Sequence, residues 1–375
     1  MKAMYIKDIR ERDAVEGVFL VQQKTTALSK NGSAYLTMKL MDRTGEVEAR
    51  IWDRVDELDR LFDRDDFIAV RGKANVYMNK MQLVVQDLSR VEDSAVNLAD
   101  FLPVSSRPLA EMQQELAQKV ASLEDPFVRR LLEAFLADEA FMRGFCQAPA
   151  AKSMHHVYLG GLLDHSLSVA RLADEIAGHY PSINRDLLIA GALLHDIGKI
   201  RELDYARSFD YTDEGKLLGH IVLGAQMIED KIRAIPEFPE LLRTLLVHLL
   251  LSHHGQYEYG SPKRPKTLEA VVLNFLDDLD AKINGVQTHL DREAEAEGDW
   301  SSYHRLYDRY FFKAKGLKAA VAPATPEAPK TSPPPQKEAK PAERPAGRKG
   351  FGFTLADQLK GKNFDLFSEA DKERR

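Results

Sequence analysis

Histidine and aspartate side chains interrupt strongly apolar segments in the second half of the chain. In the clearest case, His195 and Asp196 directly follow Leu193-Leu194 and the apolar run Leu187–Gly191. Burying an adjacent imidazole and carboxylate costs free energy unless the two groups are paired or bind a metal ion. A single His-Asp pair is common in proteins, so the interpretation depends on the other histidines.

The same interruption recurs in four further apolar segments of the chain. The interrupting residues are His165, His220, His253, His254, Asp277 and Asp278. Imidazole and carboxylate groups bind manganese, iron, cobalt, nickel and zinc. Because the only cysteine is Cys146, a cysteine-based zinc site is excluded, which favours the harder ions of this group. These residues therefore predict a divalent metal centre assembled from separate helices.

Several polar side chains near these motifs have the chemistry to assist at a phosphate group. We predict Asp196, Lys199 and His156 as catalytic residues, and Lys263 and Arg264 as substrate contacts. A lysine or arginine can neutralise a phosphate oxygen, and a protonated histidine can assist a leaving alcohol. For Lys199, Lys263 and Arg264, a position on the ordinary solvated surface is the alternative interpretation.

The segments that carry these residues are predicted to be helical. From Pro108 to about residue 317, apolar residues recur at three- and four-residue intervals. We divide this part into a helical connector, residues 96–150, and a metal-binding domain, residues 151–317. Residues 318–375 are rich in proline and charge and are predicted to form a disordered tail. Its segment Phe351–Phe367 is either a motif for a protein partner or an incidental part of that tail.

Residues 1–95 show the alternation of apolar and polar side chains that is typical of half-buried strands. The predicted strands are Ala14–Gln23, Ala34–Met41, Val47–Trp52, Phe67–Val76 and Met81–Leu88. The segment Asp53–Phe62, between the third and fourth strands, has helical spacing instead. Five short strands with one helix after the third is the element order of an OB-fold barrel, so we predict this fold.

OB-fold barrels bind single strands by stacking bases on aromatic side chains beside a positive groove. In the predicted barrel, Tyr35 and Tyr77 are candidate stacking residues, and Lys73 is a candidate phosphate contact. Packing inside the barrel or across neighbouring strands is the alternative for both tyrosines. For Trp52 we favour that packing role.

The composition is that of a multidomain globular protein. The 375 residues are 44% hydrophobic and 29% charged, with a formal net charge of -6. No apolar run reaches the roughly 18 to 20 residues of a membrane helix, and the charged N-terminus lacks a signal-peptide core. We therefore expect a cytoplasmic protein without a membrane partner. Because the body of the chain is acidic, any nucleic-acid contact depends on local positive patches.

The order of His165, the His195-Asp196 pair and Asp277 resembles the HD superfamily of metal-dependent phosphohydrolases, which has an all-helical fold. The added histidines resemble the subset that binds two metal ions. For the first ion, the resemblance implies His165, His195, Asp196 and Asp277 as ligands. For the second, it implies His220 and His253, with His254 as a further candidate and Asp196 as a bridge. Asp277 rather than Asp278 fits the register of the family's Asp-x-x-Asp-Ala pattern.

Taken with the barrel, the motifs HHVYLGGLLDHSL, LLHDIGK, GKLLGHI and LSHHGQYEYGSPKRP are similar to the YhaM-type 3′–5′ exoribonucleases. The resemblance covers residues 5–312 and leaves the tail unexplained. It implies a two-metal enzyme, with manganese favoured over iron, cobalt or nickel. The implied substrate is single-stranded RNA trimmed from its 3′ end, with single-stranded DNA as a secondary substrate.

Two other functions stay open at this point. An HD-type hydrolase of a small nucleotide or cyclic dinucleotide would have the same ligands, but it has no need of a strand-binding barrel. A non-catalytic protein that binds single-stranded nucleic acid would be expected to have lost at least one ligand. The sequence also leaves the oligomeric state open, including a homo-oligomer.

Overall fold

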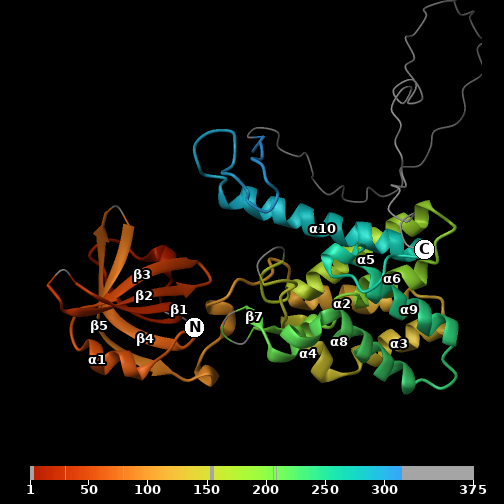
Figure 1. Cartoon of the computed structure of the whole chain (residues 1–375), viewed down its shortest axis with the longest axis horizontal. Helices are drawn as coiled ribbons and strands as arrows, with labels where there is room; N and C mark the ends of the chain where they lie inside the picture. The colour runs from red at the N-terminus through yellow and green to blue at the C-terminus, as the bar shows by residue number, and fades with distance from the viewer. Residues whose placement is uncertain are drawn as a thin grey trace, which may run out of the picture. The chain divides into compact units, whose positions relative to one another are not determined.

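A computed structural model describes residues 4–314, except residues 30, 79, 153–155, 206 and 208 (Figure 1). The predicted tail, residues 318–375 with its segment Phe351–Phe367, lies outside the described residues. The described chain forms a strand-rich N-terminal part and a helical part. None of its helices is both long enough and apolar enough to cross a membrane.

Five strands close a barrel in the N-terminal part. They are β1 (Ala14–Leu28), β2 (Ala34–Asp42), β3 (Gly45–Ile51), β4 (Phe67–Tyr77) and β5 (Lys80–Val91). Their order around the barrel is β1-β2-β3-β5-β4, and only the β3–β5 pair is parallel. Residues Ala14–Leu20 of β1 pair with β4 and residues Leu20–Leu28 pair with β2, and the register with β2 shifts between Val21 and Gln23. Such a bulge bends a strand, which helps one long strand to close the barrel.

Alternate side chains of these strands fill the barrel, as the sequence pattern predicts. In β2, Leu36, Met38 and Leu40 are buried, while the residues between them are partly exposed. The five-stranded OB-like barrel is therefore confirmed. The predicted helix Asp53–Phe62 is shorter than expected: it contracts to α1 (Val55–Leu58), followed by a turn of 3₁₀ helix.

The rest of the described chain is mainly helical, which confirms the predicted helical HD fold. The helices are α2 (Leu109–Ala121), α3 (Pro126–Leu136), α4 (Glu139–Gln147), α5 (Gly161–His179), α6 (Arg185–Leu194), α7 (Lys199–Glu202), α8 (Asp213–Arg233), α9 (Glu240–Ser252) and α10 (Leu268–Arg292). Two-residue strands β6 (Leu203–Asp204) and β7 (Asp210–Tyr211) pair between α7 and α8. Helices α2 to α4 share one apolar core with α5 to α10, so the segment we describe as a connector packs into the helical body.

Helix α6 is the centre of the helical core. Every residue of α6 except Arg185 is buried, as expected for a helix that is apolar on all sides. It packs against α5 and α9, and α10 lies along both α5 and α6 (Figure 1). Because His195 and Asp196 directly follow α6, this packing carries them into the interior.

Candidate metal centre and strand-binding surface

The first group of candidate ligands comes from α5, the end of α6 and α10. His165 Nε2 lies 3.2 Å from both His195 Nε2 and Asp277 Oδ1. His195 Nε2 lies 3.3 Å from Asp196 Oδ2. Both imidazole rings are fully buried. The four side chains that the family resemblance implies for one ion therefore present nitrogen and oxygen atoms to one point.

Hydrogen bonds at the opposite ring nitrogens fix the orientation of these two histidines. His195 Nδ1 donates to the carbonyl oxygen of Ala192 at 2.9 Å, and His165 Nδ1 lies 2.7 Å from Asp280 Oδ2. Since a carbonyl oxygen only accepts, the proton of neutral His195 is on Nδ1, which leaves Nε2 as a lone-pair donor. This outer hydrogen bond is typical of metal-binding histidines.

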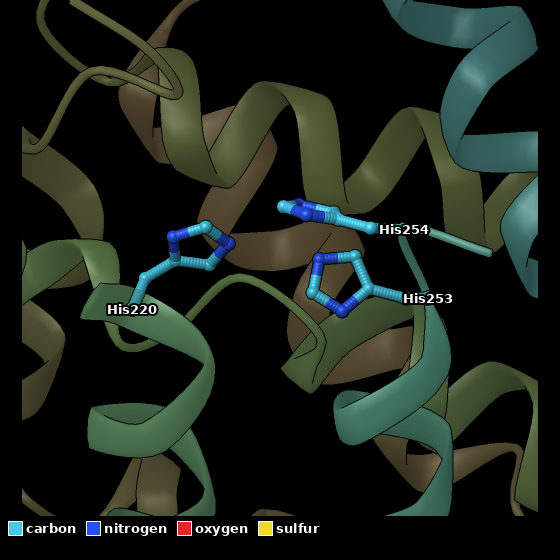
Figure 2. Close-up of side chains that lie close together, drawn as sticks. All are labelled: His220, His253 and His254. Carbon is cyan, nitrogen blue, oxygen red and sulfur yellow. The ribbon is translucent and has the colours of Figure 1, made fainter. Parts of the chain in front are cut away.

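The second group is formed by His220 from α8 and by His253 and His254 at the end of α9, whose rings gather at one place (Figure 2). Ring centroids are 4.3 Å apart for His253 and His254 and 5.2 Å apart for His220 and His254. The Nδ1 atom of each ring again forms a hydrogen bond with a group next to the cluster. Its partners are Glu202 Oε1 for His220 at 2.9 Å, the Leu250 carbonyl for His253 at 2.7 Å and the Tyr259 carbonyl for His254 at 2.9 Å.

A glycine just before His220 makes this geometry accessible. Gly219 has φ 73° and ψ 157° inside α8, a conformation that is essentially restricted to glycine. The resulting kink frees the His220 backbone N–H, which donates to Glu202 Oε1 at 2.9 Å together with the ring. Glu202 thus holds both the backbone and the imidazole of His220.

Asp196 lies between the two groups. Its Oδ1 is 3.5 Å from His220 Nε2 and 3.6 Å from His253 Nε2, whereas its Oδ2 faces His195. Lys199 Nζ donates to Oδ2 at 2.6 Å and is itself buried. Among the carboxylates that the structure describes, Asp196 is therefore the one that lies next to both groups of histidines.

Three buried atoms at this point have no hydrogen-bond partner among the described residues: Asp196 Oδ1, His220 Nε2 and His253 Nε2. A buried polar atom without a partner costs about 1–3 kcal/mol, so three that converge need a common explanation. Divalent ions coordinated by imidazole and carboxylate would satisfy all three. The residues present thus fit the metal centre that the sequence predicts.

The pKa of His195, in the first group, and that of His253, in the second, shift in opposite directions. Burial alone would lower the pKa of His195, but the Asp196 and Asp277 carboxylates raise it to about 10. Burial and the neighbouring His254 hold the pKa of His253 well below its usual range. Without metal ions, a proton on His195 therefore balances the carboxylates, whereas His253 is neutral and already a lone-pair donor.

Two carboxylates next to the candidate ligands were missed in the sequence. Asp280 contacts His165 and also accepts a hydrogen bond from Ser168. It is the second aspartate of the Asp-x-x-Asp-Ala pattern, so its spacing from Asp277 was a usable signal. Glu202 had no such signal, because 18 residues and the kink at Gly219 separate it from His220.

The predicted catalytic residue His156 is placed differently from the expectation. Its Nε2 lies 2.9 Å from Asp280 Oδ2 and its Nδ1 lies 2.6 Å from the Tyr158 hydroxyl, so both ring nitrogens are engaged. A leaving alcohol therefore has no free nitrogen of His156 to meet. The structure puts this ring behind His165, where it supports Asp280; its neighbour His155 lies outside the described residues.

The other predicted site residues divide into buried and exposed positions. Lys199 is buried and paired with Asp196, which contradicts the solvated-surface alternative for this lysine. Lys263 and Arg264 are exposed in the loop that follows α9 and the two adjacent histidines. Asp278 is exposed and forms an ion pair with Lys282 at 2.6 Å, so the structure brings Asp277 and not Asp278 to the centre.

Aromatic side chains gather on the outside of the barrel. The rings of Tyr35 and Trp52 are stacked with centroids 4.8 Å apart, and the Arg50 guanidinium lies 5.6 to 5.9 Å from the rings of Tyr35, Trp52 and Tyr77. Trp52 and Tyr77 are exposed, as is Lys73 on β4. Trp52 thus packs across neighbouring strands against Tyr35, one of the two packing roles that we favoured, but it lies on the outer surface and not in the barrel core.

Comparison with protein families gives the class of protein that this fold and these residues define. Residues 18–91 match the family model of the OB-fold nucleic acid binding domain, and residues 162–282 match that of the HD domain. Among solved structures, the chain is similar to the HD domain of the L. monocytogenes phosphodiesterase PgpH. That likeness has 21% identity, covers 39% of this chain and 73% of the other, and has a TM-score of 0.27.

The more specific assignment comes from curated relatives. The chain is 36% identical to the 3′-5′ exoribonuclease YhaM of Bacillus subtilis (strain 168) over 317 residues, which cover 83% of this chain and 98% of the relative. It is 34% identical to YhaM of Geobacillus sp. (strain WCH70) over 302 residues, which cover 80% and 92%. The chain therefore belongs to the YhaM family, and the resemblance predicted from its motifs is confirmed.

Proposed function

We propose that this protein is a metal-dependent 3′–5′ exoribonuclease that hydrolyses phosphodiester bonds of single-stranded RNA, with single-stranded DNA as a secondary substrate. One observation carries the proposal: three unpartnered buried ligand atoms converge where Asp196 meets His220 and His253. The YhaM relatives are 3′-5′ exoribonucleases, which supports the direction of hydrolysis and the RNA substrate. Because the proposed substrate is cellular RNA, we also propose a cytoplasmic location.

Two divalent ions are part of the proposal, with manganese favoured over iron, cobalt and nickel. The first would be held by His165, His195, Asp196 and Asp277, and the second by His220, His253 and His254 with Asp196 shared. Bound ions of this kind activate water as a nucleophile and stabilise the negative charge that develops on the phosphoryl group. The imidazoles supply neutral ligands, and Asp196 and Asp277 supply the charge that divalent cations need.

The remaining residues of the chain have supporting roles in this proposal. Lys199 holds one oxygen of Asp196, so that the other oxygen faces His220 and His253. Lys263 and Arg264 are exposed on the adjoining loop and are proposed to contact phosphates of the strand. On the barrel, Tyr35, Tyr77, Trp52 and Arg50 would stack on bases, and Lys73 would contact the backbone.

A time course with 5′-labelled single-stranded RNA and Mn²⁺ tests this function, and α10 offers a matched pair of variants. Asp277→Asn alters a proposed ligand, whereas Asp278→Asn alters its exposed neighbour. We expect stepwise shortening from the 3′ end by the wild type and by Asp278→Asn, and none by Asp277→Asn or with EDTA. RNA that is bound but stays intact would support the non-catalytic alternative. RNA that is neither bound nor shortened would support the small-nucleotide alternative.

A further inference from the structure

Two exposed tyrosines lie in the loop beside the second group of histidines. Tyr257 and Tyr259 are 57% and 71% exposed and belong to one turn of 3₁₀ helix, Tyr257–Tyr259. The main-chain carbonyl of Tyr259 accepts the hydrogen bond from His254 Nδ1 at 2.9 Å. The segment that orients a candidate metal ligand therefore also displays two aromatic rings to solvent.

This loop is held in place although its aromatic rings are exposed. The Lys263 backbone N–H donates to the Leu251 carbonyl at 3.0 Å, which closes the loop on the end of α9. Ser261, only 3% exposed, donates from its backbone to the Gln256 carbonyl at 3.2 Å. A rigid aromatic surface loses little conformational entropy when a planar partner stacks on it.

The charges around the two rings match a polyanion. Residues 254–266 contain the cations Lys263, Arg264 and Lys266 and one carboxylate, Glu258. The Arg264 guanidinium lies 5.2 Å from the centroid of the Tyr257 ring. Exposed aromatic faces with cations beside them are the combination by which proteins bind single-stranded nucleic acid.

We propose that Tyr257 and Tyr259 stack on the unpaired bases at the 3′ end of the strand and thereby place its last phosphodiester at the metal centre. This inference rests on the proposed function and adds to it a second base-stacking surface, separate from that of the barrel. The two tyrosines are binding residues: they hold bases, while bond cleavage belongs to the metal centre. A paired 3′ end is rejected because its bases are not free to stack on the loop.

The direct test uses a fluorescent base, so that its readout does not require turnover. A single-stranded RNA carries 2-aminopurine at its 3′ end or, as a control, at its 5′ end, and is bound to the full-length protein in EDTA. Stacking on an aromatic ring quenches this fluorophore. We expect quenching at the 3′ end with the wild type and with Tyr257→Phe/Tyr259→Phe, and its loss with Tyr257→Ala/Tyr259→Ala.

Kinetics with Mn²⁺ provides the second measurement. The double alanine variant should raise KM for RNA about 5- to 100-fold and leave kcat within about 2-fold, since stacking contributes to binding and not to bond cleavage. The matched control is Tyr180→Ala. Tyr180 is exposed as well, at 53%, but it follows the C-terminal end of α5, whereas His165 lies near the N-terminal end of that helix. It should behave as the wild type.

The outcomes separate the inference from the function on which it rests. Equal 3′-end fluorescence with the wild type and the double alanine variant would overturn the stacking role, even if RNA is degraded. A KM rise that is the same for RNA whose 3′-terminal nucleotides are abasic would also overturn it, because no base is then involved. Failure of the wild type to shorten RNA would instead overturn the proposed function, and 3′-end quenching would still support the stacking surface.

Discussion

The barrel carries its candidate binding residues on its outer surface, whereas the helical part carries its candidate metal ligands inside its core. In the barrel, Tyr35 and Arg50 alternate with the core residues Leu36 and Ile51, so the aromatic surface lies outside the packing. In the helical part, His165, His195 and His253 are fully buried and interrupt the core itself. A strand separates its two faces by its period of two, whereas a buried ligand must find polar partners within the core.

The difference has consequences for how each part tolerates change. Substitutions on the barrel surface remove binding contacts and leave the packing intact, so they should change affinity alone. Substitutions at the metal centre remove a ligand and also leave its buried partners unsatisfied. We therefore expect binding to be lost in small steps in the barrel and hydrolysis to be lost in large steps in the helical part.

The largest effect should come from Asp196→Asn. This change removes the carboxylate that lies between both groups of histidines, and we expect RNA hydrolysis to fall about 1,000-fold or more. Binding of single-stranded RNA should stay within about 3-fold of the wild type, because the barrel surface is unchanged. Hydrolysis is measured by gel and binding by fluorescence anisotropy in EDTA. Equal loss of both, with unchanged circular dichroism, would break the proposed separation between the two parts.

A smaller effect is expected from Glu202→Gln. The amide can still accept a hydrogen bond from His220 but lacks the charge that makes the imidazole a stronger ligand, so metal affinity should fall about 10- to 100-fold. The activity should recover at saturating Mn²⁺. Glu214→Gln is the control, since Glu214 forms only an exposed ion pair with Arg201. Identical Mn²⁺ titrations for both variants would show that Glu202 does not support the centre.

The sequence predicted the architecture because its two periods are distinct. Alternation over Phe67–Val76 and helical spacing after Pro108 each follow from one buried face, and both folds were confirmed. The shortening of the helix Asp53–Phe62 was not predictable from spacing. Its N-terminal neighbour Arg54 has φ 57°, and the segment ends as a turn of 3₁₀ helix while Val55, Leu58 and Phe62 pack into the barrel core.

The sequence pattern also predicted part of the candidate site. Histidines in apolar helices are rare enough to be noticed, so the residues that the structure brings together could be selected. Orientation was not accessible: the pairing of His156 with Asp280 and of Glu202 with His220 depends on how separate helices meet. Nor was the exposure of Trp52, which lies just beyond the end of β3 and turns toward Tyr35.

On the barrel, Trp52→Ala should weaken binding of single-stranded RNA about 5- to 150-fold, because stacking on one aromatic side chain contributes about 1–3 kcal/mol. The value of kcat at saturating RNA should stay unchanged. Leu61→Ala is the matched control. Leu61 is 45% exposed, close to the 44% of Trp52, but it lies on the turn of 3₁₀ helix after α1. A fall in kcat with unchanged affinity would show that this surface acts on the chemistry and would remove the contrast with the helical part.

The smallest effect concerns Arg50, whose guanidinium lies within 6 Å of the three ring centroids. Arg50→Lys keeps the charge but loses the planar group, so affinity should fall about 2- to 5-fold with an unchanged dependence on salt. Arg50→Gln removes the charge as well, and its slope of log affinity against log salt should become shallower by about 0.7. If both variants change the slope of log affinity against log salt equally, the aromatic surface of the barrel does not bind RNA in the proposed geometry. If only Arg50→Gln does, stacking and charge are separate contributions on the barrel, in contrast to the metal centre, where the Asp196 carboxylate lies next to histidines of both groups.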